Sequence, residues 1–414
     1  MKKKLLFVES NTTGTGMLAL KKAVSWGLTP IFLCNKPERY LGLEETGSVV
    51  IVCDTNDVEA LKETIAANVA VEEICGFATT SEFYLEAVAT LATHYGLPGN
   101  PPEAMRTARN KSLTRQALAA AGVGQPRFAI VKGQADLEQA LATVPVPCVV
   151  KPADDSGSND VLLCNTLAEV EAHTLKILSV TTNMRGQATA GTVLIEEYVD
   201  APEFSVEMFT WEGKTTCIGI TEKSLTGFPY FVESRHIFPA QLAPEVAEEI
   251  RSTVIKALAA VGVKNGATHT ELKLTPEGAK IIEINARLAG GMIPELIRLA
   301  TGVDMLEQQI RCSVDGPQDL VVEYAGHAGI KFIMAPEAGV LSEIRGADAA
   351  KCVPGVEQVI VTGKPGASVQ PPQNAYHRLG SVIVKGDTYE ETVATLETAL
   401  ANIDVVLEAS VIKN

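Results

Sequence analysis

Residues 267 to 287, ATHTELKLTPEGAKIIEINAR, decide the fold because they describe a β-hairpin with one polar face. Residues 276 to 278 form a natural three-residue loop, since Pro suits a type I turn and Gly the left-handed residue after it. The register set by this loop predicts four facing pairs: Thr275 with Ala279, Lys273 with Ile281, Glu271 with Glu283, and His269 with Asn285. Two carboxylates therefore lie side by side on the polar face, and Arg287 follows further along it.

This polar face has an ordinary and a functional interpretation. Two acids whose Cβ atoms lie ~4.5 to 5.5 Å apart repel each other mildly, which an exposed face would tolerate. The other face is apolar enough to pack on a core, so a rigid sheet displays the acids: Thr270, Leu272, Leu274, Ile282 and Ile284. Glu271, Glu283 and Asn285 offer the hard oxygen atoms that Mg²⁺ takes together with water and phosphates. The hairpin therefore predicts a metal site with a phosphate-bearing partner.

A second stretch supplies candidate phosphate ligands. Lys151 ends an apolar strand and is followed by DDSGSND, residues 154 to 160, whose backbone N–H groups could surround phosphate oxygens. Lys111 precedes it on a predicted helix, ARNKSLTRQALAAAG. Either lysine alone would by default be a solvated surface residue. Together with the acidic hairpin they favour nucleotide phosphates.

The order of elements indicates several domains of mixed α/β and α+β class. Up to about Asn100, short apolar strands alternate with helical patterns, which predicts a doubly wound parallel sheet. From Leu194 the strands become antiparallel, and residues 375 to 403 read as strand, turn and helix. We expect an N-terminal α/β domain at 1–110, a small subdomain at 111–200, and a large subdomain with a mixed C-terminal region at 201–414.

Composition excludes several classes of protein. A formal net charge of −15 argues against a general nucleic-acid binder. MKKKLLFVES has too short an apolar core for a signal peptide, and no stretch is long and apolar enough for a membrane span, so we expect a cytoplasmic protein. The eight cysteines are scattered without C-x-x-C spacing, which indicates reduced core residues.

The N-terminal glycines offer an alternative, a nicotinamide-binding or non-catalytic protein. Gly14, Gly16 and Ala19 have the G-x-G-x-x-[GA] spacing between a strand and a helix. The acid expected after the second strand is missing, since PIFLC ends in Cys34, Asn35 and Lys36. The turn is therefore equally typical of a plain connection.

Five segments, taken in order, resemble the ATP-grasp superfamily of ATP-dependent carboxylate–amine ligases: ARNKSLTRQAL, PCVVKPADDSGSNDV, VLIEEYVDAPEFSVE, THTELKL and IIEINARLAGG. The likeness covers most of the chain, including the N-terminal α/β domain and HRLGSVIVKGDTYEE near the end. It implies an ATP-grasp fold, in which two antiparallel sheets grip the nucleotide. The cofactors implied are ATP and Mg²⁺, two ions by the usual pattern, with Mn²⁺ as an alternative.

The resemblance assigns roles to particular residues. It implies Lys111 and Lys151 on the ATP phosphates, under a covering loop that contains Ser156, Gly157 and Ser158. It implies an adenosine strip of Glu196, Glu197 and Val199, with Glu203 on the ribose hydroxyls. Glu271, Glu283 and Asn285 match the metal ligands, and Arg287 matches the guanidinium that stabilises phosphoryl transfer. One departure is Asp160 after the loop, which we expect to point away from the phosphates.

Within the superfamily, TTSEFYLEA, FVESRHIFP and NARLAGGM look most like the L-amino-acid ligases, which join two amino acids into a dipeptide. That likeness implies that Glu82 holds the ammonium of the first amino acid, and that Glu233 and His236 lie where the acyl phosphate meets the amine. It also implies that Gly290 and Gly291 line the acceptor site. The ordinary alternatives are a helix-capping Glu82 and a satisfied buried imidazole at His236.

The expected reaction is phosphorylation of a carboxylate by ATP, followed by attack of an amine on the acyl phosphate. Arg287 and backbone N–H groups near Gly290 and Gly291 would hold the carboxylate, and residues 183 to 191 would form a lid with the Gly/Ser loop. The rival is an ATP-grasp carboxylase or purine-pathway ligase that uses bicarbonate or formate. The partners expected are small amino-acid substrates and a second copy in a homodimer, with neither nucleic acid nor membrane.

Overall fold

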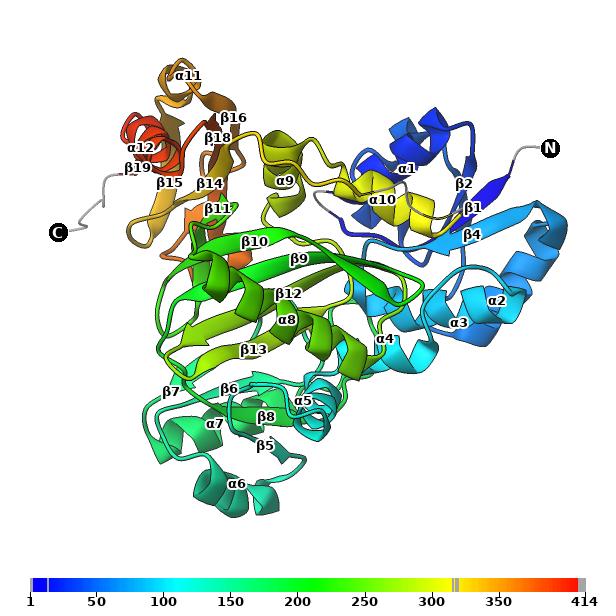
Figure 1. The fold of residues 1–414 in the computed structure, drawn as a ribbon, viewed down its shortest axis with the longest axis horizontal. Helices are drawn as coiled ribbons and strands as arrows, with labels where there is room; N and C mark the ends of the chain where they lie inside the picture. The colour runs from blue at the N-terminus through cyan, green and yellow to red at the C-terminus, as the bar shows by residue number, and fades with distance from the viewer. Residues whose placement is uncertain (1–2, 13–14, 315, 317–319, 409–414) are drawn as a thin grey trace.

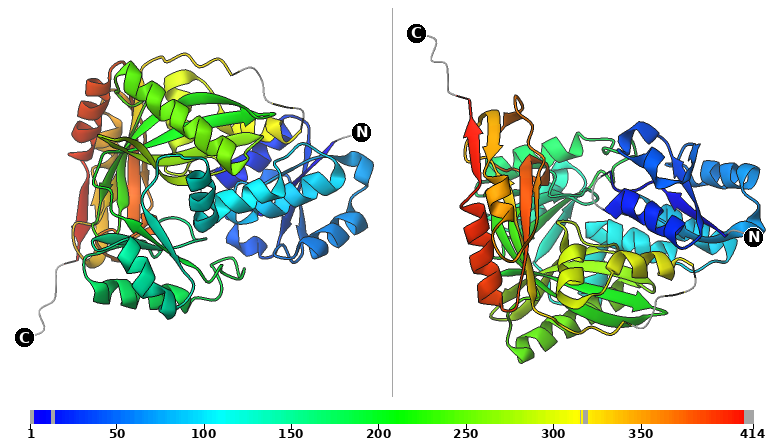
Figure 2. Two further views of the ribbon diagram at one scale, coloured as in Figure 1. Left: turned by 60° about the horizontal axis from the view of Figure 1, so that its bottom comes forward. Right: turned by 90° about the horizontal axis from the view of Figure 1, so that it is seen from above.

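The computed structural model describes residues 3–12, 15–314, 316 and 320–408. Figure 1 shows an N-terminal sheet with its helices, a small sheet, and a large sheet that runs into the C-terminal strands. In both views of Figure 2 the N-terminal sheet and the C-terminal helix α12 (Tyr389–Leu400) lie at opposite ends of the molecule. The two expected classes, α/β and α+β, are both present.

The N-terminal sheet is parallel and doubly wound, as predicted. Its order is β3-β2-β1-β4, with β1 (Lys4–Val8), β2 (Thr29–Cys34), β3 (Val49–Val52) and β4 (Ile74–Ala78). Alternate side chains of β1 enter two cores, since a strand covered on both faces is apolar throughout. One core contains α2 (Val58–Asn68) and α3 (Leu85–Tyr95); the other contains α1 (Thr15–Ser25) and α10 (Met305–Cys312), which arrives from late in the chain.

The predicted helix over ARNKSLTRQALAAAG is two helices, α4 (Pro102–Arg109) and α5 (Lys111–Ala120). Asn110 separates them because its side chain accepts hydrogen bonds from the N–H groups of Ser112 and Leu113 as an N-cap. This break places Lys111 at the first position of α5, where it is buried.

The small sheet has the order β5-β8-β6-β7, formed by β5 (Phe128–Val131), β6 (Cys148–Pro152), β7 (Leu162–Cys164) and β8 (Val193–Glu197). The antiparallel pair β6 and β7 confirms the two strands predicted around the Gly/Ser loop. Helices α6 (Leu137–Thr143) and α7 (Leu167–Leu178) pack against this sheet and share its core.

The large sheet has eight strands in the order β13-β12-β9-β10-β11-β14-β18-β16. In chain order they are β9 (Glu203–Trp211), β10 (Lys214–Thr226), β11 (Val232–Phe238), β12 (Gly266–Thr275), β13 (Gly278–Asn285), β14 (His327–Met334), β16 (Val356–Val361) and β18 (Arg378–Gly386). Helix α8 (Pro244–Val261) packs on the apolar face of its first strands, which leaves their polar face toward the small sheet.

The C-terminal strands extend this large sheet, and the predicted strand, turn and helix are confirmed as β18 followed by α12. A further three-stranded sheet contains β15 (Gly339–Arg345), β17 (Ser368–Val369) and β19 (Asp404–Leu407). The remaining helices are α9 (Ile293–Thr301) and α11 (Ala347–Lys351), with 3₁₀ turns at Pro37–Arg39, Leu43–Thr46, Val71–Glu73, Glu82–Tyr84, Gln134–Asp136 and Ala375–His377.

The hairpin that opened the sequence analysis forms, with one change of register. Glu271 faces Glu283 and His269 faces Asn285, as predicted. The prediction for the turn is wrong: Lys273 faces Lys280 and Thr275 faces Gly278, so the loop has two residues and a bulge at Ile282 restores the register. Ile281 and Ile284 consequently enter the core, whereas Ile282 lines the cleft beside Glu283 instead of packing with them.

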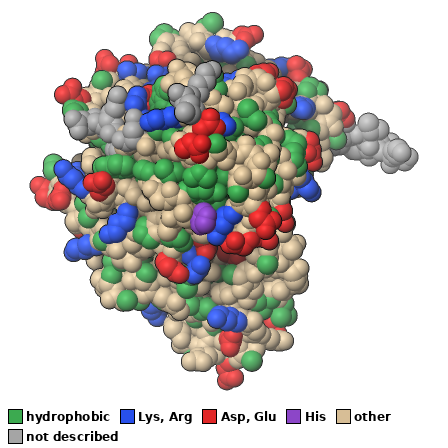
Figure 3. All heavy atoms as spheres, turned by 90° about the vertical axis from the view of Figure 1, so that its right-hand side faces the viewer, with side chains coloured by type: hydrophobic (Ala, Val, Ile, Leu, Met, Phe, Trp, Pro, Cys, Tyr) green, Lys and Arg blue, Asp and Glu red, His purple; other side chains and the backbone are tan. Residues whose placement is uncertain are grey.

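Surface and cysteines fit the compositional expectations with one exception. On the face shown in Figure 3, Lys and Arg side chains are interspersed with Asp and Glu rather than gathered in one basic field. Cys352 is an exposed free thiol, so the interpretation of all eight cysteines as core residues is wrong there. Among the described residues no helix is both long and apolar enough to cross a membrane.

Candidate active site

A cleft of about 250 Å³ separates the small sheet from the polar face of the large sheet. Its lining brings together all of the nucleotide and metal residues that the sequence suggested: Lys111, Lys151, Ser156, Gly157, Ser158, Glu196, Glu197, Val199, Glu203, Glu271, Glu283 and Asn285. These residues come from α5, β6, the following loop, β8, β9 and the hairpin of β12 and β13. We call this space the nucleotide cleft.

Glu196 is held at the base of the cleft by two cations. Lys151 Nζ lies 2.7 Å from Glu196 Oε2, and Arg115 Nε lies 2.5 Å from Oε1. Burial alone would raise the pKa of Glu196, but Arg115 and Lys151 outweigh it and lower that pKa to about 2. The carboxylate is thereby engaged within the protein, which leaves the backbone of β8 to meet a ligand.

Arg115 is a structural residue that the sequence analysis missed. Its Nη1 donates to the carbonyl of Ile281 at 2.9 Å and its Nη2 to the carbonyl of Ile282 at 2.6 Å. One guanidinium therefore joins α5, β8 and the bulge that sets the position of Glu283. The sequence offered one signal for it: Arg115 lies four residues after Lys111 and therefore on the same face of the helix.

The two carboxylates of the candidate metal site are each paired with a lysine. Lys223 of β10 is buried, and its Nζ lies 2.8 Å from Glu271, 2.7 Å from Glu233 and 3.1 Å from Glu203. Burial opposes the charge on Lys223, yet the three carboxylates raise the pKa of Lys223 well above its ordinary value. On the second acid, Lys111 Nζ lies 3.3 Å from Glu283 Oε1. Sequence reasoning missed Lys223 because lysine is by default a surface residue.

The donor set fits a hard divalent cation. Glu271, Glu283 and Asn285 supply two carboxylates and one amide oxygen on neighbouring strands. Among the described residues no group of three His, Cys, Asp or Glu gathers to form a closed metal site. An open set of this kind is typical of Mg²⁺ sites that phosphates and water complete.

Arg287, which is half-buried, pairs with the buried Glu82 at the end of the cleft. Arg287 Nε donates to Glu82 Oε2 at 2.7 Å, and its Nη2 donates to the same oxygen. Burial would raise the pKa of Glu82, but Arg287 and Arg109 lower it to about 2. Glu82 begins a 3₁₀ turn, where the preceding Ser81 makes no side-chain cap. Its expected contact with an ammonium group stays a prediction.

A second cavity of about 1160 Å³ lies between the N-terminal sheet, α9 and the C-terminal strands. Glu82 and Phe83 line it, together with Phe332 of β14. The cavity meets the nucleotide cleft at five residues that line both: Ser156, Arg287, Gly290, Gly291 and Arg378. We call this space the substrate cavity and the shared residues the junction.

His236 and Glu233 lie beside the junction in different surroundings. Glu233 lines the nucleotide cleft, but His236 is fully buried behind Gly291. A Cβ added to Gly291 would come within 2.8 Å of the imidazole Nε2 of His236. Neither ring nitrogen has a hydrogen-bond partner in the described part of the chain, and Nε2 lies 3.6 Å from Glu233 Oε2. The imidazole is therefore buried without being satisfied, and burial lowers the pKa of His236, which favours its neutral form.

The Gly/Ser loop turns Asp160 away from the cleft, as expected. The Asp160 carboxylate pairs with Lys176 of α7, and its carbonyl accepts a hydrogen bond from His173 Nε2 at 2.8 Å. Gly157 and Ser158 both have positive φ, at 70° and 58°. Left-handed residues in such a loop can turn successive N–H groups toward an anion.

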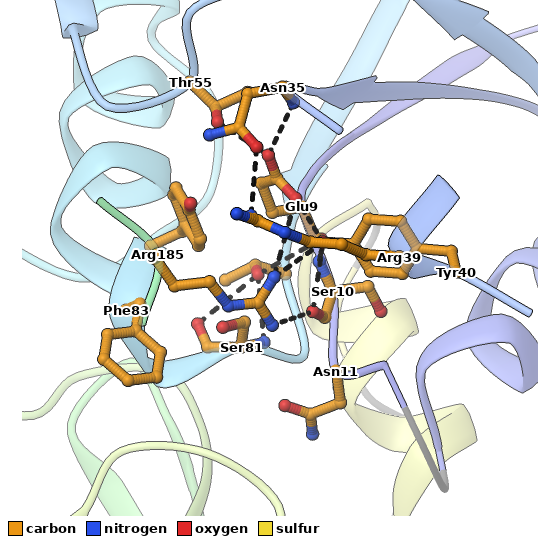
Figure 4. A network of polar contacts seen from close by, with 12 residues as sticks. Glu9, Ser10, Asn11, Asn35, Arg39, Tyr40, Thr55, Ser81, Phe83 and Arg185 are labelled. Atoms are coloured by element: carbon orange, nitrogen blue, oxygen red, sulfur yellow. Dashed lines mark hydrogen bonds and ion pairs between the residues drawn. The ribbon is translucent and has the colours of Figure 1, made fainter. Parts of the chain in front are cut away.

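Residues 183 to 191 are anchored in this structure, which contradicts their interpretation as a free lid. Arg185 is buried, and it donates to the carbonyl of Ser10 at 2.9 Å and to the hydroxyl of Tyr40 at 3.0 Å (Figure 4). Glu9 lies next to it, fully buried, and accepts from the N–H of Asn35 at 2.7 Å. This network fills the carboxyl edge of the N-terminal sheet.

The same network bears on the nicotinamide alternative. Gly14 lies outside the described residues, and a Cβ on Gly16 would lie 2.1 Å from the carbonyl oxygen of Asn11. Gly16 is therefore required by a close backbone approach. A nicotinamide-binding protein would hold its dinucleotide at the end of β1. In this structure Glu9 and Arg185 occupy that place.

Arg185→Met is expected to release residues 183 to 191 from the N-terminal sheet. The loss of two buried charge-assisted hydrogen bonds should lower the free energy of unfolding by roughly 1.5 to 3 kcal/mol. Hydrogen exchange of the amides in this segment should accelerate, whereas the neighbouring exposed Met184→Ala should leave it unchanged. Unaltered protection in Arg185→Met would contradict the anchoring.

Comparison with known proteins agrees with this geometry. The ATP-grasp domain family matches residues 144–295, and L-amino acid ligase C-terminal domain 2 matches residues 331–408. The uncharacterized protein y4rH of Sinorhizobium fredii is 30% identical over 404 residues, which cover 98% of this chain and 83% of that protein. The chain belongs to the ATP-grasp superfamily. Its C-terminal part is similar to a domain of the L-amino acid ligases.

Two further proteins are similar to this chain. The alanine–anticapsin ligase of Bacillus subtilis is 30% identical over 273 residues, which cover 61% of this chain and 57% of that protein. The chain thus spans little more than half the length of that relative. The L-amino acid ligase of Bacillus licheniformis has the same fold, with a TM-score of 0.82, 24% identity and 99% coverage of both chains. The superfamily uses ATP with a divalent metal, which fits the cleft described above.

Proposed function

We propose that this ATP-grasp ligase joins the carboxylate of one L-amino acid to the amine of another, with release of ADP and phosphate. The observation that carries this proposal is the junction, where a cleft lined by nucleotide residues opens into a separate substrate cavity. A carboxylate in that cavity would meet the terminal phosphate of ATP at Arg287. The family of the C-terminal domain supports amino acids as the substrates.

The nucleotide cleft would hold ATP with its phosphates toward the junction. Lys111, Lys151 and the loop of Ser156 to Ser158 would contact the phosphates, and the backbone of Glu196 to Val199 the adenine. Glu203 would meet the ribose. Two Mg²⁺ ions, or Mn²⁺ in their place, would be held by Glu271, Glu283 and Asn285, and would supply charge neutralisation at the phosphates.

The first step forms a bond between a carboxylate oxygen and the γ-phosphorus, while ADP leaves with the bridging electron pair. Arg287 would stabilise charge on the transferred group. The amine then attacks the acyl carbon, and phosphate leaves with one oxygen of the former carboxylate. The amine loses a proton, for which we assign Glu233, which lines the cleft, with the neutral imidazole of His236 buried 3.6 Å behind it. The small subdomain, residues 111–200, would close over the site. We also propose that the protein is cytoplasmic and forms a homodimer.

Assay of the twenty L-amino acids, singly and in pairs, with ATP and Mg²⁺ tests the proposal. We expect phosphate release to require a pair, and mass spectrometry to identify the dipeptide. Release that depends on bicarbonate or formate would instead support the carboxylase or purine-pathway activity. The absence of ATP turnover under every condition would contradict both.

A further inference from the structure

Arg378 is fixed at the junction by contacts from two neighbouring strands. It begins β18, in the C-terminal domain, and lines both the nucleotide cleft and the substrate cavity. Its guanidinium lies 3.7 Å from the centre of the Phe332 ring of β14. Its Nη2 donates to the carbonyl and to the carboxylate Oε2 of Glu233 of β11, each at 3.0 Å. The side chain is therefore ordered before any substrate binds.

The two junction arginines differ in the donors that they leave open. Every guanidinium nitrogen of Arg287 has a protein acceptor: Nε and Nη2 donate to Glu82, and Nη1 donates to the carbonyl of Leu288 at 3.0 Å. In Arg378 only Nη2 donates to the described part of the chain, and its Nε is buried without a partner. The Nη1 group of Arg378 is left for a ligand.

The acid that Arg378 contacts is shared with a second cation. Glu233, the acid that Arg378 contacts, is shared with Lys223, whose Nζ lies 2.7 Å away. The Glu233 carboxylate therefore interacts with two cations, of which Lys223 also pairs with Glu271 and Glu203. On the other side Glu82 is directed to Arg287 and to Arg109, at 3.5 Å, rather than to Arg378.

We propose that Arg378 binds the carboxylate that ATP phosphorylates, and that Arg287, held by Glu82, serves the phosphoryl group. This inference rests on the proposed function and changes the residue that binds the carboxylate, which the sequence analysis expected to be Arg287. Guanidinium groups suit planar carboxylates, and a preordered one binds at a lower entropic cost. The C-terminal domain thus contributes a substrate-binding residue directly to the site.

Arg378 would also act in the step that follows. As the carboxylate oxygen bonds to phosphorus and ADP departs, the second carboxyl oxygen becomes the carbonyl of the acyl phosphate. A hydrogen bond from Arg378 to that oxygen withdraws electrons from the acyl carbon. It also stabilises the negative oxygen that forms when the amine attacks, before phosphate leaves.

Hydroxylamine can replace the second amino acid and convert the acyl phosphate into a hydroxamate. The first step can therefore be measured without knowing which amino acid is the acceptor. The probe is the L-amino acid, among twenty, that gives wild-type protein the most hydroxamate with ATP and Mg²⁺. We expect Arg378→Met to raise the KM for that amino acid roughly 10- to 100-fold and to leave the KM for ATP within about twofold. Arg378→Lys should fall between Arg378→Met and wild type, because it keeps the charge without the planar fork.

Controls separate binding from a merely structural role. Arg345→Met removes an arginine of the same domain that pairs only with Glu343, so both KM values should be unchanged. In Arg378→Ala, added methylguanidine should restore part of the rate, which a loss of folding would not allow. An unchanged amino-acid KM in Arg378→Met would overturn this inference alone. A wild-type protein that forms no hydroxamate with any amino acid would overturn the proposed function as well.

Discussion

Glu283→Gln is expected to lower kcat by at least about 100-fold, because it removes a carboxylate from the proposed metal site. Mutation of a residue that only hydrogen-bonds to a metal ligand typically lowers metal affinity or activity about 10- to 100-fold, so loss of a ligand itself should lower activity more. Glu283 faces Glu271 across the hairpin and lies 3.3 Å from Lys111. The isosteric amide keeps the shape but supplies one charge fewer, and the KM for Mg²⁺ should therefore rise.

The matched control is Glu277→Gln in the turn of the same hairpin. Glu277 is exposed and distant from the cleft, so its variant should keep wild-type kinetics. Circular dichroism and thermal unfolding should show both variants folded. Full activity in Glu283→Gln would remove this residue from the metal site.

Arg115→Met is expected to have the largest effect on stability, lowering the free energy of unfolding by about 3 kcal/mol. Removal of one partner from a buried ion pair leaves the other charge uncompensated. Arg115 and Glu196 are both buried, although Lys151 would still neutralise part of the remaining charge. The carbonyls of Ile281 and Ile282 would also lose their donors, which should disturb the bulge and weaken ATP binding.

Urea unfolding as a function of pH measures this contribution. The pKa of Glu196, lowered to about 2, lies below its unfolded value of ~4.3. The pair therefore stabilises wild-type protein above pH ~4.3, and that stability is lost as the pH falls from there toward 2. Gln116→Met, at the exposed neighbouring position on α5, serves as the control. Equal unfolding free energies at pH 7 for Arg115→Met and wild type would contradict the structural role of Arg115.

The sequence predicted those parts of the site that depend on short-range order. Glu271 and Glu283 are close in the chain and joined by a turn, so their pairing followed from the loop and the strand period. The bulge at Ile282 could not be predicted from the hairpin sequence, because Arg115, which is distant in the chain, donates hydrogen bonds to the carbonyls of Ile281 and Ile282. Local turn chemistry alone therefore gave the wrong register near residue 278.

Residues that acquire their roles through long-range contacts escaped prediction. Lys223 is buried only because acids from β9, β11 and β12 converge on it. Arg185 was placed in a lid because its stretch is rich in small residues, but its partners lie in the N-terminal sheet. Arg378 reaches the junction because β14 and β18 extend the large sheet, an arrangement with no local signature.

The acyl phosphate is tested most directly by following oxygen from the carboxylate. An amino acid labelled with ¹⁸O in its carboxyl group is incubated with unlabelled ATP, Mg²⁺ and the second amino acid, and the phosphate is analysed by mass spectrometry. We predict that each dipeptide formed is accompanied by ADP and by one inorganic phosphate carrying a single ¹⁸O atom. Formation of AMP with the label in it, or of phosphate without label, would contradict the mechanism.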